Sequence, residues 1–218
     1  MFQKKLYILD IQKIQESVKH VNIFIRDTVD STNQCLKRMI HRLRTGDVFL
    51  AEHQTRGFGR RGKKWFSSPG NSICLSLYWK FRINLNFINA ISLAIGISVA
   101  KVLNELYDCK IILKRPNDLY IQNRKVGGIL IETTSILKEE VHCIIGIGIN
   151  LSENDTFHQK IKKSWTTLQK TIGRVECNQI VSAIIRETHR TLVMFEKNHH
   201  FFNDRHFELR ENIRIYRE

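Results

Sequence analysis

Four short apolar runs lie close together between residues 111 and 151, and they constrain the fold more than any other feature of the chain. They are Ile111–Leu113, Leu119–Ile121, Gly127–Thr134 and Val141–Leu151. Only brief polar turns separate them, and runs of this length joined by short turns are typical of strands that pair in antiparallel fashion. We therefore expect a largely antiparallel sheet.

Segments with helical spacing of apolar residues surround these runs. Helices are predicted over residues 8–18, 35–43, 89–107 and 178–196. The second follows Asp30-Ser31-Thr32-Asn33, whose side chains suit a helix cap, and Ile23–Ile25 is predicted to be a strand. Because the strands are grouped between helices, the expected fold class is α+β, with a mixed, largely antiparallel central sheet flanked by helices.

The stretch from Gln54 to Lys64 contains three glycines, five cations and no acidic side chain, and Trp65 follows it. Glycines let a backbone approach a ligand closely, and Arg and Lys neutralise phosphate or carboxylate. We interpret this stretch as a mobile anion-binding loop between two strands, with an indole placed to stack on a base. A solvated hairpin loop and a patch for nucleic-acid phosphates are open alternatives on this segment alone.

The length of 218 residues fits one domain, and the formal net charge of +14 would suit a polyanionic partner. Lys and Arg are spread along the whole chain, however, and the enrichment in Lys, Ile and Asn favours compositional drift over nucleic-acid binding.

Five widely spaced cysteines without a C-x-x-C pair indicate reduced thiols in a cytoplasmic protein rather than a zinc site. Cys74 and Cys143 lie in apolar runs and are predicted to fill the core. The longest apolar tract, residues 87–103, is interrupted by polar residues and is shorter than the ~20 residues of a membrane span. It is predicted to be a buried helix.

Three further segments place polar groups where a core strand would not need them. They are Lys114-Arg115-Pro116-Asn117-Asp118, the segment from Arg124 to Glu132 with its glycine pair, and the alternating glycines of residues 145–150. Alternation puts Gly146, Gly148 and Asn150 on one face of a strand, which predicts a flat shelf. Taken singly, these segments are also compatible with a proline turn, a hairpin with a solvated lysine, and an ordinary strand.

In order and spacing, these segments together resemble the biotin protein ligase family. The family's G-R-G-R-R-G-x-x-W corresponds to Gly57–Trp65, and its K-W-P-N-D to Lys114–Asp118. Its K-x-G-G-I-L-x-E corresponds to Lys125–Glu132, its G-I-G-I-N to Gly146–Asn150, and its D-S-T-N to Asp30–Asn33. Five linked motifs over residues 27–151 make this a specific match.

The resemblance implies the catalytic domain of the biotin and lipoate protein ligases, which is similar to class II synthetases. Family members use ATP and Mg²⁺ to convert biotin to biotinyl-5′-AMP. They then pass biotin to one lysine of a biotin carboxyl carrier protein, as in acetyl-CoA carboxylase. A carboxylate must attack a negatively charged phosphate, so fixed cations are the expected catalytic groups and no covalent nucleophile is needed.

The resemblance also implies roles for individual residues. The expected catalytic residues are Lys125, Arg60 and Lys114. The expected biotin-binding residues are Ser31, Thr32, Asn33, Gln54, Gly57, Phe58, Gly59, Arg60, Lys125 and Gly128. The expected ATP-binding residues are Arg60, Arg61, Trp65, Lys114, Asp118, Lys125 and Asn150, with Asp118 also the candidate metal ligand.

Two positions depart from the family pattern. Phe58 replaces the first arginine of the loop, and Arg115 replaces a tryptophan. We expect residues 1–210 to form the catalytic domain, and residues 211–218 to be a tail or the start of an incomplete C-terminal β domain. Because about thirty residues precede Asp30, we expect a monofunctional form without the helix-turn-helix repressor domain.

Three alternatives to a biotin ligase are a lipoate or octanoate ligase or transferase of the same fold, a basic nucleic-acid-binding module, and an inactive ligase retained as a binding protein. The resemblance favours a cytoplasmic enzyme without DNA or membrane binding. Relatives often pair through the central sheet, which is compatible with a homodimer, and the residues leave the oligomeric state open.

Overall fold

The computed structural model describes residues 8–19, 21–82, 88–137, 140–153, 164–198 and 215–216. Its helices are α1 (Ile11–Ser17), α2 (Thr32–Met39), α3 (Ile88–Tyr107), α5 (Leu168–Ile172) and α6 (Cys177–Asn198), with short 3₁₀ helices η1 (Ile40–Arg42) and η2 (Arg60–Gly62). Its strands are β1 (Ile23–Val29), β2 (Val48–Gln54), β3 (Ser72–Phe81), β4 (Ile112–Lys114), β5 (Asp118–Ile121), β6 (Arg124–Leu137), β7 (Glu140–Asn150) and β8 (Ile215–Tyr216).

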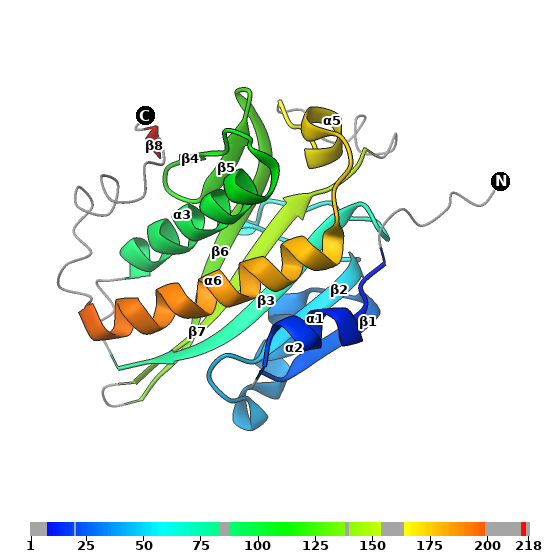
Figure 1. Cartoon of the computed structure of the whole chain (residues 1–218). Helices are drawn as coiled ribbons and strands as arrows, with labels where there is room; N and C mark the ends of the chain where they lie inside the picture. The colour runs from blue at the N-terminus through cyan, green and yellow to red at the C-terminus, as the bar shows by residue number, and fades with distance from the viewer. Residues whose placement is uncertain are drawn as a thin grey trace.

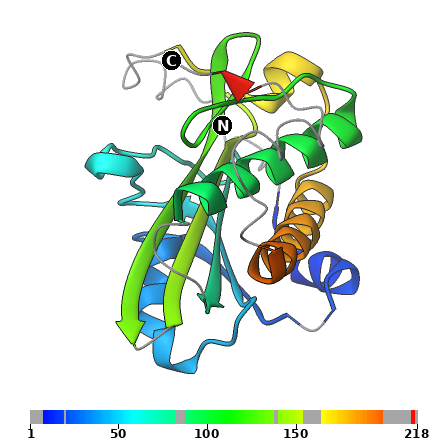
Figure 2. The same ribbon diagram turned by 90° about the vertical axis from the view of Figure 1, so that its left-hand side faces the viewer.

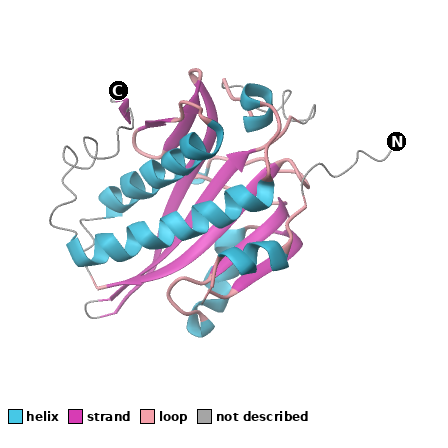
Figure 3. Ribbon diagram, viewed as in Figure 1, coloured by secondary structure: helices cyan, strands magenta, loops and turns pink. Residues whose placement is uncertain are grey.

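The eight strands within the described residues belong to one sheet, in the order β1-β2-β3-β7-β6-β5-β4-β8 (Figure 1, Figure 3). The β1–β2 and β4–β8 pairs are parallel and the other pairs are antiparallel. The parallel β1–β2 pair is joined through α2, because parallel neighbours need a crossover connection. The predicted fold class, a mixed and largely antiparallel sheet flanked by helices, is confirmed.

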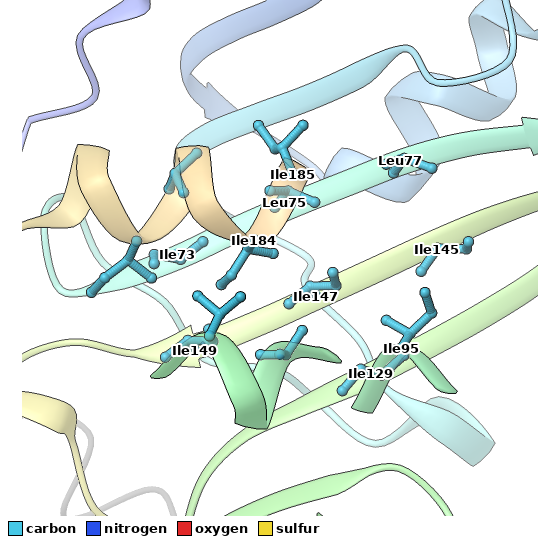
Figure 4. Close-up of a cluster of buried hydrophobic side chains, with 14 of the residues drawn as sticks. Ile73, Leu75, Leu77, Ile95, Ile129, Ile145, Ile147, Ile149, Ile184 and Ile185 are labelled. Atoms are coloured by element: carbon cyan, nitrogen blue, oxygen red, sulfur yellow. The ribbon is translucent and has the colours of Figure 1, made fainter. Parts of the chain in front are cut away.

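The main core lies between one face of the sheet and helices α1, α3 and α6 (Figure 2). Side chains alternate along each strand, so every second residue of the central strands points into this layer. Figure 4 shows Ile73, Leu75 and Leu77 of β3 beside Ile145, Ile147 and Ile149 of β7, Ile129 of β6, Ile95 of α3, and Ile184 and Ile185 of α6. Burial of each such side chain contributes about 1.5–3 kcal/mol to folding.

Helix α3 is the predicted buried helix. Over Ala90–Tyr107 it is long and apolar enough, by length and composition alone, to cross a membrane, but 61% of this stretch is buried inside the protein. Its apolar side chains pack against α6 and the sheet. This agrees with the prediction of a core helix.

The opposite face of the sheet carries α2 and the loop that contains η2. A second, smaller apolar cluster holds α2 to this face, and it consists of Cys35, Leu36, Phe49, Tyr78 and Ile144. Beside this cluster, β3 and β7 present small residues, Cys74, Ser76, Gly146 and Gly148, instead of large ones. Their small size leaves room for a cavity on this face.

The expected element boundaries differ from the observed ones at several points. The second helix ends at Met39 and continues as η1, and β6 begins at Arg124 rather than at Gly127. Helix α5 was not predicted. The residues 199–214, 217 and 218, which include most of the expected C-terminal tail, lie outside the described residues.

Candidate functional site

A cavity of about 720 Å³ opens on the sheet face opposite α3 and α6. Its walls come from the start of α2, the glycine loop, the β4–β5 turn, the beginning of β6 and the end of β7. These segments are the five motifs of the sequence, so the fold brings them together at one place. The expected site residues that line the cavity are Ser31, Thr32, Asn33, Gln54, Phe58, Gly59, Arg60, Arg61, Trp65, Lys114, Asp118, Lys125, Gly128 and Asn150.

Gly57 is the one expected site residue that does not line the cavity. It is buried behind the loop, and a Cβ added to it would lie 2.7 Å from the backbone oxygen of Trp65. The Trp65 N–H donates to the Gly57 carbonyl at 2.9 Å, so the two strands of the loop approach closely here. Gly57 therefore has a structural reason to be glycine, and its expected role in binding biotin stays a prediction.

The glycine loop is a closed turn in this structure. The Gly59 N–H donates to the Lys63 carbonyl at 2.7 Å, and Phe58 pairs with Lys64. Between them, Arg61 and Gly62 have φ angles of +56° and +68° in the left-handed region. The turn is exposed, and it carries the guanidinium of Arg60 and the neighbouring cations that line the cavity.

Trp65 and the alternating glycines of β7 fit against each other. A Cβ on Gly148 would lie 2.6 Å from the Trp65 indole, and a Cβ on Gly146 would lie 2.7 Å from the Asn33 amide oxygen. The predicted flat shelf is thus present but is occupied by two of the protein's own side chains. The Trp65 Nε1 is buried and has no hydrogen-bond partner among the residues that the structure describes.

The polar end of the cavity is built around Gln54 and the start of α2. The Thr32 N–H donates to Gln54 Oε1 at 2.8 Å. Ser31 occupies the N-cap position and is buried, but its side chain makes no cap hydrogen bond. The prediction that a side chain of Asp30–Asn33 caps this helix is wrong at the N-cap residue Ser31. The side-chain amide oxygen of Gln54 accepts the Thr32 N–H instead.

The cationic end of the cavity is held by the β5–β6 hairpin. Lys125 Nζ lies 2.6 Å from Asp118 Oδ1, with each side chain 31% exposed. The Arg60 guanidinium donates to Asn117 Oδ1 at 3.4 Å. Arg60 and Lys125 therefore contact two consecutive residues, Asn117 and Asp118. The ammonium of Lys114 lies near the ring of Tyr120. The structure brings together the three expected catalytic cations.

Asn150 and Lys125 both form hydrogen bonds with the segment 164–166 in this structure. The Asn150 amide donates to the Thr166 carbonyl at 3.1 Å, and the segment 164–166 pairs with Lys125 through two backbone hydrogen bonds. The Lys125 N–H donates to the Ser164 carbonyl and the Thr166 N–H donates to the Lys125 carbonyl. No sequence motif marks residues 164–166, so their place beside the site was not predicted.

The cysteines agree with the prediction of reduced, structural thiols. All five are free. Cys74 lines the cavity, and burial raises its pKa to about 11, while burial raises the pKa of Cys143 to about 12. Neither thiol is a thiolate near neutral pH, so neither is suited to nucleophilic chemistry. Among the described residues there is no group of three His, Cys, Asp or Glu side chains that could hold a metal ion.

Comparison with known proteins gives one consistent result. A model of the biotin/lipoate A/B protein ligase family matches residues 25–150. The chain is 36% identical to the bifunctional ligase/repressor BirA of Salmonella typhimurium over 192 residues, which cover 88% of this chain and 60% of that protein. It is 26% identical to the biotin–[acetyl-CoA-carboxylase] ligase of Mycobacterium tuberculosis over 155 residues, 69% of this chain and 55% of that protein.

The fold is also that of a solved structure with bound ligands. The biotin protein ligase from Aquifex aeolicus in complex with biotin and ATP matches with a TM-score of 0.68 and 29% sequence identity, over 81% of this chain and 72% of that one. The chain spans 60% of the length of the BirA proteins of Salmonella typhimurium and Escherichia coli.

Proposed function

The chain belongs to the biotin/lipoate A/B protein ligase family, and we propose that it joins biotin to a protein lysine at the expense of ATP. The proposed first step forms biotinyl-5′-AMP from biotin and ATP. The proposed second step transfers biotin to a lysine of a biotin carboxyl carrier protein. The names of the relatives and the ligands of the Aquifex structure support this reaction class.

One observation carries the proposal: Arg60 and Lys125 come from separate segments and line the same cavity as Gln54 and Thr32. The cavity is polar and uncharged at the Gln54 end and cationic at the Lys125 end. A molecule with a neutral, hydrogen-bonding head and a carboxylate tail matches this arrangement. Biotin has a cyclic urea at one end and a carboxylate at the other.

The cations can lower the barrier by electrostatic means. In the proposed reaction, Lys125 lies between the biotin carboxylate and the α-phosphate of ATP, and it stabilises the charge that builds up as they meet. Arg60 holds the carboxylate and then the adenylate phosphate. Preorganised charges that are aimed at developing charge commonly account for about 100- to 1,000-fold in rate for each group removed.

Asp118 has two candidate roles in this scheme. Its carboxylate orients Lys125 through the 2.6 Å ion pair. Mg²⁺ bound to a nucleotide usually keeps its waters and takes one or two protein carboxylates besides the phosphates. A single carboxylate in the cationic part of the cavity fits such a nucleotide-borne ion, which would neutralise phosphate charge, and does not fit a metal site built by the protein alone.

The remaining cavity residues are assigned to the adenosine and to the closing of the loop. Trp65 and Asn150 are proposed to bind the adenosine moiety, together with Lys114 and Arg61. The loop from Arg56 to Lys64 is proposed to be mobile without ligand and to be ordered by it, as active-site lids commonly are.

The test incubates the protein with biotin, Mg-ATP and an acceptor carrier domain, and measures the mass of the carrier. We expect the carrier to gain one biotinyl group, and expect no gain without ATP or when the acceptor lysine is replaced by arginine. A second arm offers lipoate or octanoate in place of biotin. Preferential transfer of either acid would assign the chain to the lipoate branch, and no transfer of any acid would refute the proposal.

A further inference from the structure

Asn117, in the turn between β4 and β5, connects the glycine loop to the β5–β6 hairpin. We propose that Asn117 is the positioning residue of Arg60. It holds the guanidinium at the cationic end of the cavity through a neutral acceptor, so that the positive charge stays available to an anionic ligand. The ligand readout of this inference rests on the proposed function, in which Arg60 retains the adenylate.

Asn117 is fixed to β6 by two hydrogen bonds with a single residue. The Ile129 N–H donates to the Asn117 backbone carbonyl at 2.8 Å, and the Asn117 side-chain NH₂ donates to the Ile129 carbonyl. These bonds lie next to the Asp118–Gly128 pair, with which the pairing of β5 and β6 begins. The side chain of Asn117 therefore takes the place of a backbone donor in the sheet, and β6 sets its position.

The two ends of the Asn117 amide face partners that permit only one orientation. A backbone carbonyl only accepts, so the NH₂ faces Ile129. A guanidinium only donates, so the amide oxygen faces Arg60, whose Nη1 donates to it at 3.4 Å. In the reversed amide, oxygen would face oxygen at Ile129 and N–H would face N–H at Arg60. Both neighbours thus select the observed orientation.

The next residue along the chain holds the other cation of the site in a different way. Asp118 Oδ1 lies 2.6 Å from Lys125 Nζ, and charge-assisted contacts of this kind are about twice as strong as neutral hydrogen bonds. The contact of Arg60 is longer, and its acceptor is an uncharged amide. Two consecutive residues therefore position two cations, and of these two partners only Asp118 carries a charge that offsets its cation.

A neutral acceptor suits an arginine that must change partners when a ligand enters. Arg60 is exposed and lies in the turn that the Gly59–Lys63 hydrogen bond closes. The guanidinium can leave an amide for a carboxylate or a phosphate, because its bond to the anion is the stronger one. A carboxylate at position 117 would instead compete with the ligand for the same cation.

Two substitutions of Asn117 separate this role from a purely structural one. Asn117→Ala and Asn117→Asp both lose the NH₂ that donates to Ile129, so both lose the same support from β6. They differ toward Arg60, because alanine offers no acceptor and aspartate offers a charged one. Loss of the support alone predicts the same direction of change in both variants, whereas the proposed role predicts opposite directions.

The first measurement is the rate of trypsin cleavage after Lys63 and Lys64 in the ligand-free protein, with the fragments identified by mass. Cleavage of a native loop requires local opening, so its rate reports how often the loop leaves the hairpin. We expect Asn117→Ala to be cleaved about 2- to 10-fold faster than the parent and Asn117→Asp at least about twofold slower, on the scale of one hydrogen bond. Cleavage of Asn117→Ala at the parental rate, or of Asn117→Asp at or above it, would overturn the proposal.

Two controls test whether Arg60 carries the effect. Asn123→Asp adds the same charge at the exposed tip of the β5–β6 hairpin, outside the cavity, and should be cleaved at the parental rate. An Arg60→Met background retains both cleavage sites but lacks the cation. In it, Asn117→Ala and Asn117→Asp should be cleaved at equal rates. Unequal rates in this background would show that Asn117 acts through another group and would also overturn the proposal.

A second measurement tests the consequence for the ligand. The variants receive biotin and Mg-ATP, and biotin on the lysines of an unrelated bystander protein is compared at equal adenylate formation. Asn117→Asp should label the bystander at least about threefold more than Asn117→Ala, because the new carboxylate diverts Arg60 from the adenylate. This difference should shrink in the Arg60→Met background, whereas direct repulsion of the adenylate by the carboxylate would make it grow.

The two measurements fail separately. If the parent transfers no biotin, the proposed function fails, and the cleavage rates still decide whether Asn117 positions Arg60. If the parent is active but Asn117→Asp labels the bystander no more than Asn117→Ala does, the neutral acceptor has no bearing on the ligand and this inference is refuted.

Discussion

Lys125 Nζ lies 2.6 Å from Asp118 Oδ1, at the point where the β5–β6 hairpin enters the cavity. Gly128 lies beside this pair, and a Cβ there would be 3.3 Å from the Asp118 carboxylate and 3.5 Å from the Lys125 ammonium. The pair is about one-third exposed, so it contributes at most about 1 kcal/mol to stability. The ion pair therefore serves mainly to position the Lys125 ammonium group and adds little to the stability of the fold.

Replacing Lys125 by alanine should slow adenylate formation with little change in stability. We expect a loss of about 100- to 1,000-fold in rate, because the cation is proposed to face the charge that develops between carboxylate and phosphate. Rapid-quench measurement of biotinyl-5′-AMP gives the rate, and thermal unfolding gives the stability. Lys170→Ala is the control, because Lys170 makes an equally short ion pair with Glu153 outside the cavity. Equal rates in Lys125→Ala and Lys170→Ala would remove Lys125 from the mechanism.

Replacing Arg60 by glycine should let the adenylate escape before transfer. Arg60 lines the cavity, and its guanidinium reaches the residue next to Asp118. Without it, free adenylate should biotinylate lysines of bystander proteins, which a streptavidin blot of an added unrelated protein would detect. Arg56→Gly alters the same loop at an exposed residue that does not line the cavity, and it serves as the control. A product confined to the carrier in Arg60→Gly would contradict this role.

Introducing a methyl group at Gly148 should push the Trp65 indole out of its place. The added Cβ would lie 2.6 Å from the ring, and overpacking of this kind typically costs about 1–3 kcal/mol. We expect Gly148→Ala to lower the unfolding free energy by this amount and to weaken ATP binding. In a Trp65→Ala background the same substitution should cost much less, because the clash is absent. Equal costs in both backgrounds would show that the indole is not the obstacle.

Acidification should destabilise the protein through His189. Desolvation lowers the pKa of this imidazole below its usual value of about 6.5, against a smaller opposing effect of the hydrogen bond to the Gly46 carbonyl. The unfolded chain then binds more protons than the folded one just below that value, so stability falls as the pH drops through this window. We expect the melting temperature of His189→Gln to depend less on pH between 7 and 5 than that of the parent. His41→Gln, at an exposed position, should retain the parental dependence.

The elements with strong hydrophobic periods were predictable from the sequence. Helices α3 and α6 start and end within two residues of the expected positions, because a long apolar stripe defines them. Helix α5 was missed since it has five residues and depends on a local cap, in which the Lys170 N–H donates to Thr167 Oγ1 at 3.2 Å.

The cavity residues that lie in motifs could be predicted from the sequence. The residues that only the fold brings to the cavity could not. Arg60, Lys114 and Lys125 each lie in a recognisable pattern of charges and glycines. Glu132 ends one of the motifs, but the motif does not reveal its partner Asn33, which is 99 residues away. Ser76 lies outside every motif and meets Thr32 and Asn33, which are 44 and 43 residues away. Such long-range partners follow from the register of the sheet, which a single sequence does not specify.

Biotin-dependent exchange of labelled pyrophosphate into ATP tests the central claim most directly, because it reports only the joining of carboxylate and α-phosphate. The account predicts exchange by the parent protein that requires biotin, and a loss of about 100-fold or more in Lys125→Ala. Absence of biotin-dependent exchange in the folded parent, or undiminished exchange in Lys125→Ala, would contradict the claim that this cavity forms an acyl-adenylate between its cations.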